Sequence, residues 1–407
     1  MGLSNLGILA LCFSLFPIAQ TIFPPLKLVL CVEGVRDATS VIVVLLGSSV
    51  FSLLTLLNVS YFTRTRDTPS TLLRHLFLVA LLLFLAVNYI WTTPISPLYA
   101  AGGLVGVLSI LMKCHSYTLT NIGMANMGGK EKERGGTAVQ WPSNVSLKDF
   151  LSFLVLPTLT YESSFPRTTH IRWTFVILKL LQGALCQATA LAILFNFLVP
   201  VLEDPTPSTA LTPGLPSFLI APASIVMDLI RLSLPSIAIW LCGFVGFFSC
   251  FLGVLAEVTQ YGDRCFYGCW WNANTLGGFW SSWNLPVHVF AKRHLLLETQ
   301  LYFRLRKRGA ILLTFLASAI LHELVLSVAF KTIRPWFFLA MLSQIPLIVL
   351  SRSVQGVGGR EGATASRWGN VFVWVSLYLG QPVLELLYCR EFLANHSKEE
   401  ILCFKGK

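Results

Sequence analysis

Two ionisable side chains lie in a stretch of the sequence where charge is costly. His322 and Glu323 fall inside an apolar run at 309–330, with His322 fourteen residues past Arg308. If the run is a helix, His322 lies about 21 Å along it, well inside a hydrocarbon layer about 30 Å thick. Ionisable groups at that depth usually face a cavity or a partner. The pair is therefore either functional or held by hydrogen bonds to another helix.

His322 has the chemistry of a general base. A neutral imidazole near neutral pH can take the proton of an alcohol while the alcohol oxygen attacks an acyl carbonyl. Ser318 precedes His322 by four residues and projects from the same helical face, so a serine acyl-enzyme is conceivable. Because small serines also serve helix packing in membranes, direct transfer to the alcohol is the favoured interpretation.

Other polar residues within apolar runs have simpler explanations. Asp228 and Arg231 lie three residues apart and can pair on one helical face. Gln381 and Glu385 lie four apart in the last run. They either line the same cavity as His322 or hold a neighbouring helix.

The elements that must position these groups are membrane helices. Of the 407 residues, 55% are hydrophobic and 12% charged, whereas soluble domains carry roughly a quarter charged residues. A helix that crosses a bilayer needs roughly 20 apolar residues. Candidate runs lie near 6–32, 40–60, 73–92, 96–112, 173–201, 217–230, 233–257, 309–330, 336–350 and 370–389. We therefore expect an all-α, polytopic transmembrane bundle of about nine spans, or ten if the run at 96–112 is separate from its neighbour.

Two of these runs are ambiguous. The first has no basic region before it and no clear cleavage site, which favours a retained span, or one left by truncation, over a signal peptide. The run at 217–230 is short, so it is either a span or a re-entrant segment.

The formal net charge of +11 lies mostly in loops. The loop 258–308 carries seven basic and two acidic residues, which predicts a cytoplasmic position. Basic loops of this kind suit anionic headgroups or an anionic substrate, whereas nucleic-acid binding would need a basic soluble domain. Cys265 and Cys269 are four apart without a matching second pair, so no metal site is expected.

The same loop holds an ordered aromatic cluster. Tryptophan and tyrosine gather at membrane interfaces, which would explain the cluster by itself. The order is more specific: the segment 263–272 (DRCFYGCWWN) resembles an FYxDWWN signature, and 283–288 (WNLPVH) a WNxPVH element. The segment 157–167 (PTLTYESSFPR) resembles PTLxYxxxxPR, and 315–323 resembles a catalytic histidine helix. These motifs resemble the sterol and diacylglycerol acyltransferase branch of the membrane-bound O-acyltransferase superfamily.

Later elements at 344–347, 355–356 and 380–382 are most like the type 1 diacylglycerol O-acyltransferases. The resemblance covers about 112–390, which divides the chain into N-terminal spans (1–111), an acyltransferase core (112–390) and a short C-terminal tail (391–407). It implies a helical bundle that encloses a catalytic chamber, as a multi-pass protein of the endoplasmic reticulum membrane.

The resemblance also implies a reaction. Acyl-CoA would enter from the cytosolic side, diacylglycerol would enter from the bilayer, and the product would be triacylglycerol. It implies no cofactor and no metal, with membrane lipids as the surroundings and a homo-oligomer left open.

The resemblance assigns roles residue by residue. His322 would be the general base, and Glu323 would orient or polarise it. Asn272 and Gln381 would hydrogen-bond the reacting carbonyl or its oxyanion. The substrate-binding positions implied are Phe266, Tyr267, Trp271, His288, Ser318, Gln344, Lys307 and Arg308. The last two would face the CoA phosphates, although charge flanking a membrane span explains them equally well.

One departure keeps alternatives open. Cys269 replaces the aspartate of FYxDWWN, which either weakens a helix end or impairs acyl-CoA binding. An inactive relative is therefore one alternative, and a sterol or wax alcohol acyltransferase is another. A membrane transporter lined by His322, Glu323, Gln381 and Glu385 is a third. Transporters usually carry broken helices in matching halves, and no such pattern is visible here.

Overall fold

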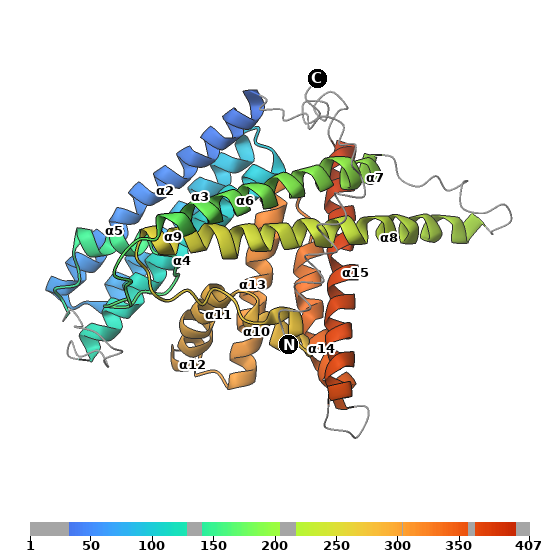
Figure 1. The fold of residues 1–407 in the computed structure, drawn as a ribbon. Helices are drawn as coiled ribbons and strands as arrows, with labels where there is room; N and C mark the ends of the chain where they lie inside the picture. Colours follow the sequence, from blue (N-terminus) through green and yellow to red (C-terminus); the bar gives the residue numbers. More distant parts are fainter. Residues whose placement is uncertain (1–31, 128–140, 204–216, 303, 357–362, 396–407) are drawn as a thin grey trace.

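The computed structural model describes residues 32–127, 141–203, 217–302, 304–356 and 363–395 (Figure 1). Within these ranges the chain is helical, with a single isolated antiparallel bridge between Arg167 and Tyr261. The predicted all-α class is therefore confirmed. The apolar run predicted at 6–32 lies, apart from its last residue, outside the described residues.

The long helices are α2 (Val32–Thr65), α3 (Thr68–Thr92), α4 (Pro97–Asn126), α6 (Trp173–Ile193), α8 (Ser217–Phe244), α13 (Lys307–Ala329), α14 (Trp336–Gly356) and α15 (Ala363–Asn395). Shorter elements between α4 and α8 are α5 (Leu147–Val155), the π-helical η1 (Leu194–Leu198) and α7 (Val199–Glu203). Those between α8 and α13 are η2 (Val245–Phe251), α9 (Leu252–Val258), η3 (Trp270–Asn272), α10 (Leu276–Ser282), α11 (Leu285–Ala291), η4 (Lys292–Leu297) and α12 (Glu298–Tyr302).

Among the described residues, 8 helical runs are long and apolar enough to cross a membrane. The expected count differs at one place, because 217–230 and 233–257 belong to one continuous run through α8, η2 and α9. The two predicted runs were separated at Arg231 because charged residues interrupt the apolar sequence there. However, Arg231 and Arg390 both pair with the buried carboxylate of Asp228. Its charge is therefore matched, and the helix continues. The span within this run, Ala223–Val258, has 36 residues and is about 54 Å long, so it must tilt in a bilayer core about 30 Å thick.

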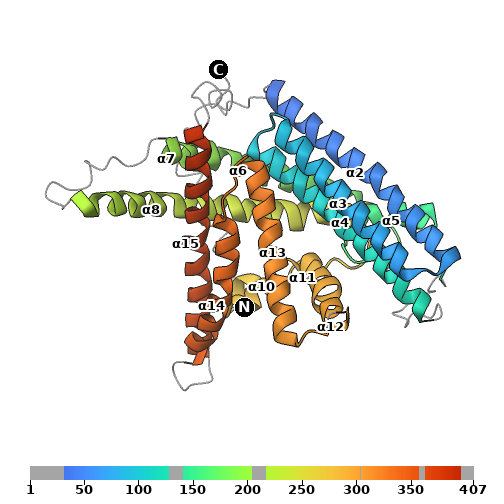
Figure 2. The ribbon, with the colours of Figure 1, turned by 180° about the vertical axis from the view of Figure 1, so that it is seen from behind.

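The long helices form three groups (Figures 1 and 2). The helices α2, α3 and α4 pack side by side as an inclined layer, while α13, α14 and α15 stand together beside it. The pair α6 and α8 crosses both groups. Helix α13 packs against α4 on one side and α14 on the other, which makes it central.

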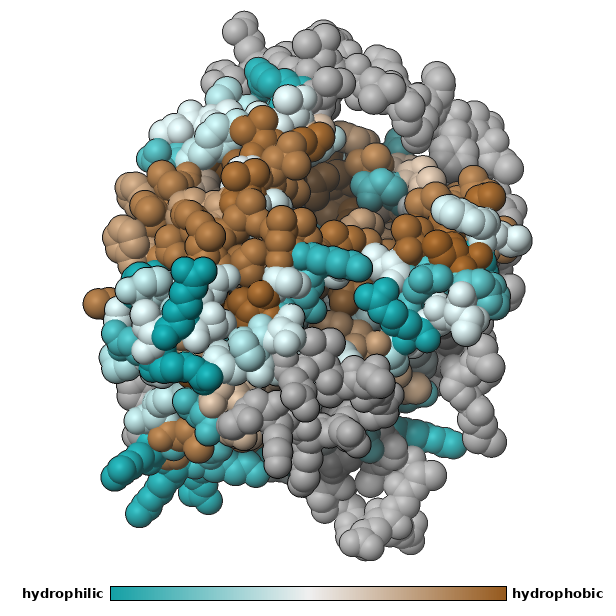
Figure 3. Space-filling model, turned by 90° about the vertical axis from the view of Figure 1, so that its left-hand side faces the viewer, coloured by the Kyte–Doolittle hydropathy of each residue, from teal (hydrophilic) through white to brown (hydrophobic). Residues whose placement is uncertain are grey.

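The outer surface carries many large apolar side chains, for example Leu46 and Val50 of α2 and Leu185 of α6. In a soluble protein such a surface would drive aggregation, whereas in a bilayer it faces lipid. Figure 3 shows apolar side chains over the upper part of one face and hydrophilic ones over the lower part. This division is typical of a surface that passes from hydrocarbon to water.

A buried lysine connects α4 to α5. The Nζ of Lys113 donates hydrogen bonds to the carbonyls of Phe153 (2.9 Å), Leu154 (2.9 Å) and Leu156 (2.6 Å). These carbonyls lie at the C-terminus of α5, where backbone acceptors lack helical partners and the helix dipole favours a cation. All three ammonium protons are thereby satisfied, and α5 is fixed against α4.

A buried carboxylate joins the start of α6 to the end of α9. Both oxygens of Glu257 accept from Arg172, by way of its backbone N–H (2.7 Å), Nε (3.1 Å) and Nη2 (2.9 Å). Arg264 adds a further hydrogen bond from the loop that follows α9. Two arginines from different segments therefore converge on one carboxylate that is fully buried.

The two loops that contribute Arg172 and Arg264 also pair through their backbones. The N–H of Thr168 donates to the carbonyl of Gln260 (2.9 Å), and the N–H of Gly262 donates to that of Pro166 (2.7 Å). A Cβ at Gly262 would lie 3.0 Å from the oxygen of Pro166, so only glycine allows this approach without a shift. The segments 157–167 and 263–272, far apart in the sequence, are thus held side by side.

We expect Glu257→Gln to lower the free energy of unfolding by ~2 kcal/mol, because a hydrogen bond between charged groups is worth about that much when buried. The neutral amide also leaves two arginines without a counter-charge. The measurement is thermal unfolding of the detergent-purified protein. Glu391→Gln is the matched control, since Glu391 pairs with the exposed Arg334 and should cost less than about 1 kcal/mol. Equal losses from the two changes would contradict a special role for Glu257.

Candidate active site

His322 lies on the central helix α13, and its ring stacks on Phe337 near the start of α14. The ring centroids are 5.3 Å apart and the planes are inclined by 15°. The side chain is nevertheless exposed. The imidazole thus lies on the side of α13 that packs against α14.

The hydrogen bonds of His322 determine its tautomer. Its Nδ1 lies 2.7 Å from the backbone carbonyl of Ser318, which can only accept, so Nδ1 must carry a proton. In the neutral ring Nε2 is then an unprotonated acceptor, which is the form a general base requires. The Ser318 Oγ is 3.3 Å from the same Nδ1. Since this nitrogen already donates to the carbonyl, it is not free to deprotonate the serine.

Glu323 is directed away from the imidazole. One carboxylate oxygen accepts from the hydroxyls of Ser327 and Tyr388, both at 2.7 Å, and the other accepts from the backbone N–H of Phe338 at 2.9 Å. These contacts connect α13 to the first turn of α14 and to α15. No hydrogen bond among the described residues joins Glu323 to His322, whose Nδ1 is held by the Ser318 carbonyl. Glu323 fixes the helices on which His322 and Phe337 lie.

The tryptophan-rich segment is attached to α15. The Nδ2 of Asn370 donates to the carbonyls of Trp271 (2.9 Å) and Ala273 (2.8 Å). The neighbouring Gly369 has no room for a side chain, because a Cβ there would lie 2.1 Å from the carbonyl oxygen of Asn274. The backbone on both sides of Asn272 is thus fixed. Its own side chain is exposed and has no hydrogen-bond partner among the described residues.

Aromatic packing holds the rest of this segment. Phe266 is buried, and Tyr267 packs edge-to-face on Phe244 with ring centroids 5.0 Å apart. Trp283 stacks on Trp240 of α8 at 5.2 Å and 17°. The cluster is therefore a packed core between the loop and α8, which goes beyond a simple interfacial belt.

Helix α10 joins the segment to α14. The indole N–H of Trp280 donates to Gln344 Oε1 at 3.3 Å, and the N–H of Leu276 donates to Ser351 Oγ at 3.2 Å. Gln344 follows Phe337 by seven residues, or about 10 Å along α14. Phe337, on which the imidazole of His322 stacks, and Gln344, which Trp280 of α10 contacts, are thus about two turns apart on α14.

Other expected site residues have contacts of their own. Gln381 hydrogen-bonds Glu385, and Glu385 accepts from Ser236 of α8, so this pair holds a neighbouring helix. His288 lies on the surface of α11, where partial desolvation and the nearby Lys292 lower its pKa. Lys307 and Arg308 are exposed in the first turn of α13. No hydrogen bond among the described residues joins any of these to His322.

A family model for the membrane-bound O-acyltransferase family (MBOAT) matches residues 39–390. The chain belongs to the membrane-bound O-acyltransferase family. The match extends over all the long helices except the first seven residues of α2 and the last five of α15.

Curated members of this family include close relatives of the chain. It is 33% identical over 314 residues to Diacylglycerol O-acyltransferase 1 of Dictyostelium discoideum, covering 74% of this chain and 47% of the relative. It is 32% identical over 340 residues to the Bos taurus protein of the same name, covering 80% of this chain and 65% of the relative. It is 31% identical over 329 residues to the Homo sapiens protein of that name, covering 77% of this chain and 62% of the relative. The chain thus spans between about half and two-thirds of the length of these relatives.

The departure at Cys269 has a limited structural effect in this membrane-bound O-acyltransferase. Cys269 is exposed at the N-cap of η3, and its side chain caps no N–H of that helix. An aspartate could accept such a hydrogen bond. The turn is formed nevertheless, because Asn370 and the tryptophan cluster hold it from both sides.

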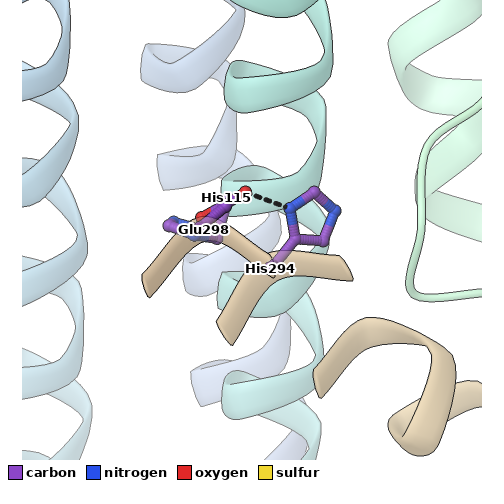
Figure 4. A group of neighbouring side chains, drawn as sticks. All are labelled: His115, His294 and Glu298. Atoms are coloured by element: carbon purple, nitrogen blue, oxygen red, sulfur yellow. Dashed lines mark hydrogen bonds and ion pairs between the residues drawn. The ribbon is translucent and has the colours of Figure 1, made fainter. Parts of the chain in front are cut away.

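Sequence reasoning missed a second group of ionisable residues (Figure 4). His115, His294 and Glu298 place their polar atoms within 4.8 Å of one another. His294 and Glu298 are four residues apart, a helical spacing that was detectable. His115 comes from α4, and nothing in the sequence connects it with the other two.

We expect Tyr388→Phe to lower the free energy of unfolding by about 1–2 kcal/mol, because it removes the hydroxyl that donates to Glu323 and accepts from the Phe337 N–H. Thermal unfolding in detergent measures this. Tyr378→Phe on the same helix is the control, since the Tyr378 hydroxyl has no described hydrogen-bond partner. A Tyr388 variant as stable as the control would show that the Glu323 contacts do not stabilise the helices.

Proposed function

We propose that this protein transfers a fatty acyl chain from acyl-CoA to the free hydroxyl of diacylglycerol, making triacylglycerol in the endoplasmic reticulum membrane. The single observation that carries the proposal is the exposed imidazole of His322 within a membrane span, with its Nδ1 fixed by a backbone carbonyl and its Nε2 left to accept a proton. The names of the relatives supply the substrates.

The reaction requires one proton to move twice. The Nε2 of His322 takes the proton of the diacylglycerol hydroxyl as that oxygen attacks the thioester carbonyl. The carbon–sulfur bond then breaks, the CoA thiolate takes the proton from Nε2, and the imidazole is neutral again. General-base catalysis of this kind typically contributes 10²- to 10⁴-fold. No acyl-enzyme is formed.

The oxyanion of the tetrahedral intermediate needs hydrogen-bond donors. Asn272 is the stronger of the two expected candidates, because its side-chain amide has no described partner while the backbone around it is held by Asn370. Gln381 already hydrogen-bonds Glu385. Donors fixed in advance in a site that excludes water lower the barrier more than mobile ones do.

The start of α13 supports an anionic donor such as acyl-CoA. Arg306, Lys307 and Arg308 are exposed at the N-terminus of this helix, where the helix dipole disfavours cations. A bound phosphate would receive both the backbone N–H groups of the helix end and these three charges. The helix that carries His322 would then also carry the CoA anchor.

We expect His322→Ala to lower triacylglycerol synthesis by at least ~10²-fold without loss of protein, because the general base is removed. The assay supplies labelled oleoyl-CoA and diacylglycerol to microsomes from cells that lack neutral-lipid synthesis. His170→Ala, which changes an exposed histidine in the loop before α6, is the matched control.

The products of this assay separate the alternatives. Activity that survives His322→Ala would remove His322 from the mechanism. Steryl or wax ester in place of triacylglycerol would show that the acyl acceptor is a sterol or a wax alcohol. No ester from the unchanged protein at normal expression would favour a transporter or an inactive relative.

Ser318→Ala tests direct transfer against a serine acyl-enzyme. We expect the rate to fall by less than about tenfold, because the backbone carbonyl that holds Nδ1 remains and only one weak contact is lost. The same microsomal assay measures it, with protein amount matched by immunoblot. A loss as large as that of His322→Ala would instead identify Ser318 as the nucleophile.

A further inference from the structure

Three potential metal ligands from two distant parts of the chain meet beside α13. His115 comes from α4, His294 from η4 and Glu298 from the start of α12 (Figure 4). His294 Nδ1 lies 2.8 Å from one carboxylate oxygen of Glu298, and His115 Nε2 lies 3.6 Å from the other. His294 is buried and the other two are partly buried.

The remaining ring nitrogens already have partners. His294 Nε2 lies 2.8 Å from Ser116 Oγ, which also accepts the backbone N–H of Tyr161 at 2.8 Å. His115 Nδ1 lies 3.1 Å from Nε2 of His75. Metal-binding histidines commonly hydrogen-bond through the nitrogen that does not face the ion, because that contact fixes the ring and its tautomer. Both histidines therefore present one nitrogen to the carboxylate and hold the other in place.

We propose that His115 Nε2, His294 Nδ1 and the carboxylate of Glu298 form a binding site for a divalent transition-metal ion of the zinc class. Two histidines and one carboxylate are a ligand set that zinc accepts, with a fourth tetrahedral position left for water. The three ligand atoms lie within 4.8 Å of one another, whereas ligands of a tetrahedral zinc ion are roughly 3.4 Å apart. Side-chain movements of about 1 Å would close the site.

A metal-free hydrogen-bonded cluster accounts for one of the two contacts with Glu298, that of His294 Nδ1 at 2.8 Å, but not for the other. At 3.6 Å the contact between His115 and Glu298 is too long for a hydrogen bond. The Nε2 of His115 therefore points at a carboxylate that it does not reach. An ion between the three groups would satisfy all of them at once.

The ion would fasten the end of the long loop to the helical layer. His115 belongs to the inclined layer of α2 to α4, whereas His294 and Glu298 directly precede α13, and η4 packs against α13. Metal binding would therefore stabilise the position of α13 relative to α4. The ion would have a structural role, so its binding can be measured by metal content and thermal unfolding without an activity assay.

The test uses the full-length protein purified in detergent without a histidine tag, stripped with chelator and incubated with Zn²⁺. After gel filtration, we expect about one zinc ion per chain by elemental analysis. Thermal unfolding should shift upward with Zn²⁺ and return after chelation. In the Co²⁺-loaded protein, the visible absorption should be that of a tetrahedral site.

His115→Gln and Glu298→Gln should each reduce the bound metal at least tenfold and abolish the Zn²⁺-dependent shift. His170→Gln, in the loop before α6, should retain one ion. The proposal is overturned if the unchanged protein holds no zinc above the buffer level, an outcome that needs no variant to fold. It is also overturned if both variants keep the same metal content as the control.

Discussion

The carboxylate of Glu257 is the contact on which the arrangement of the candidate site depends. It collects Arg172 from the segment before α6 and Arg264 from the segment after α9. Through it, two loops more than eighty residues apart in the chain come side by side. One of them leads into the tryptophan turn with Asn272. Because the carboxylate is fully buried, losing these partners would leave an unpaired buried charge, so the loops stay together.

The same constraint explains how polar groups are distributed through the bundle. Each buried charge has a specific partner in another element: Lys113 has the end of α5, Asp228 has Arg390, and Glu323 has Tyr388. These contacts determine which helices are neighbours, because apolar packing alone does not select partners in lipid. His322 differs from them, since its Nε2 has no hydrogen-bond partner among the described residues.

The sequence predicted what is local and missed what is long-range. Helix α13, His322 and the tryptophan segment were predictable, because hydropathy and the order of residues define them. The partners of Glu323 were not, since Tyr388 lies 65 positions away on α15 and no pattern connects them. The continuous helix through α8 and α9 was divided near Arg231, because the second partner of Asp228, Arg390, lies on α15. His115 was missed because its partners, His294 and Glu298, lie far from it in the sequence.

The hydrogen bond between His322 and the Ser318 carbonyl has an electrical consequence under the proposed reaction. A carboxylate in that position would stabilise the imidazolium and keep a permanent ion in the bilayer core between turnovers. A carbonyl is neutral, so it places no further charge beside the resting imidazole at this depth. Positive charge on the ring then exists only while the oxyanion, or the thiolate that it expels, lies beside it. Because both charges disappear when the thiolate takes the proton, the imidazole is never an isolated cation on α13.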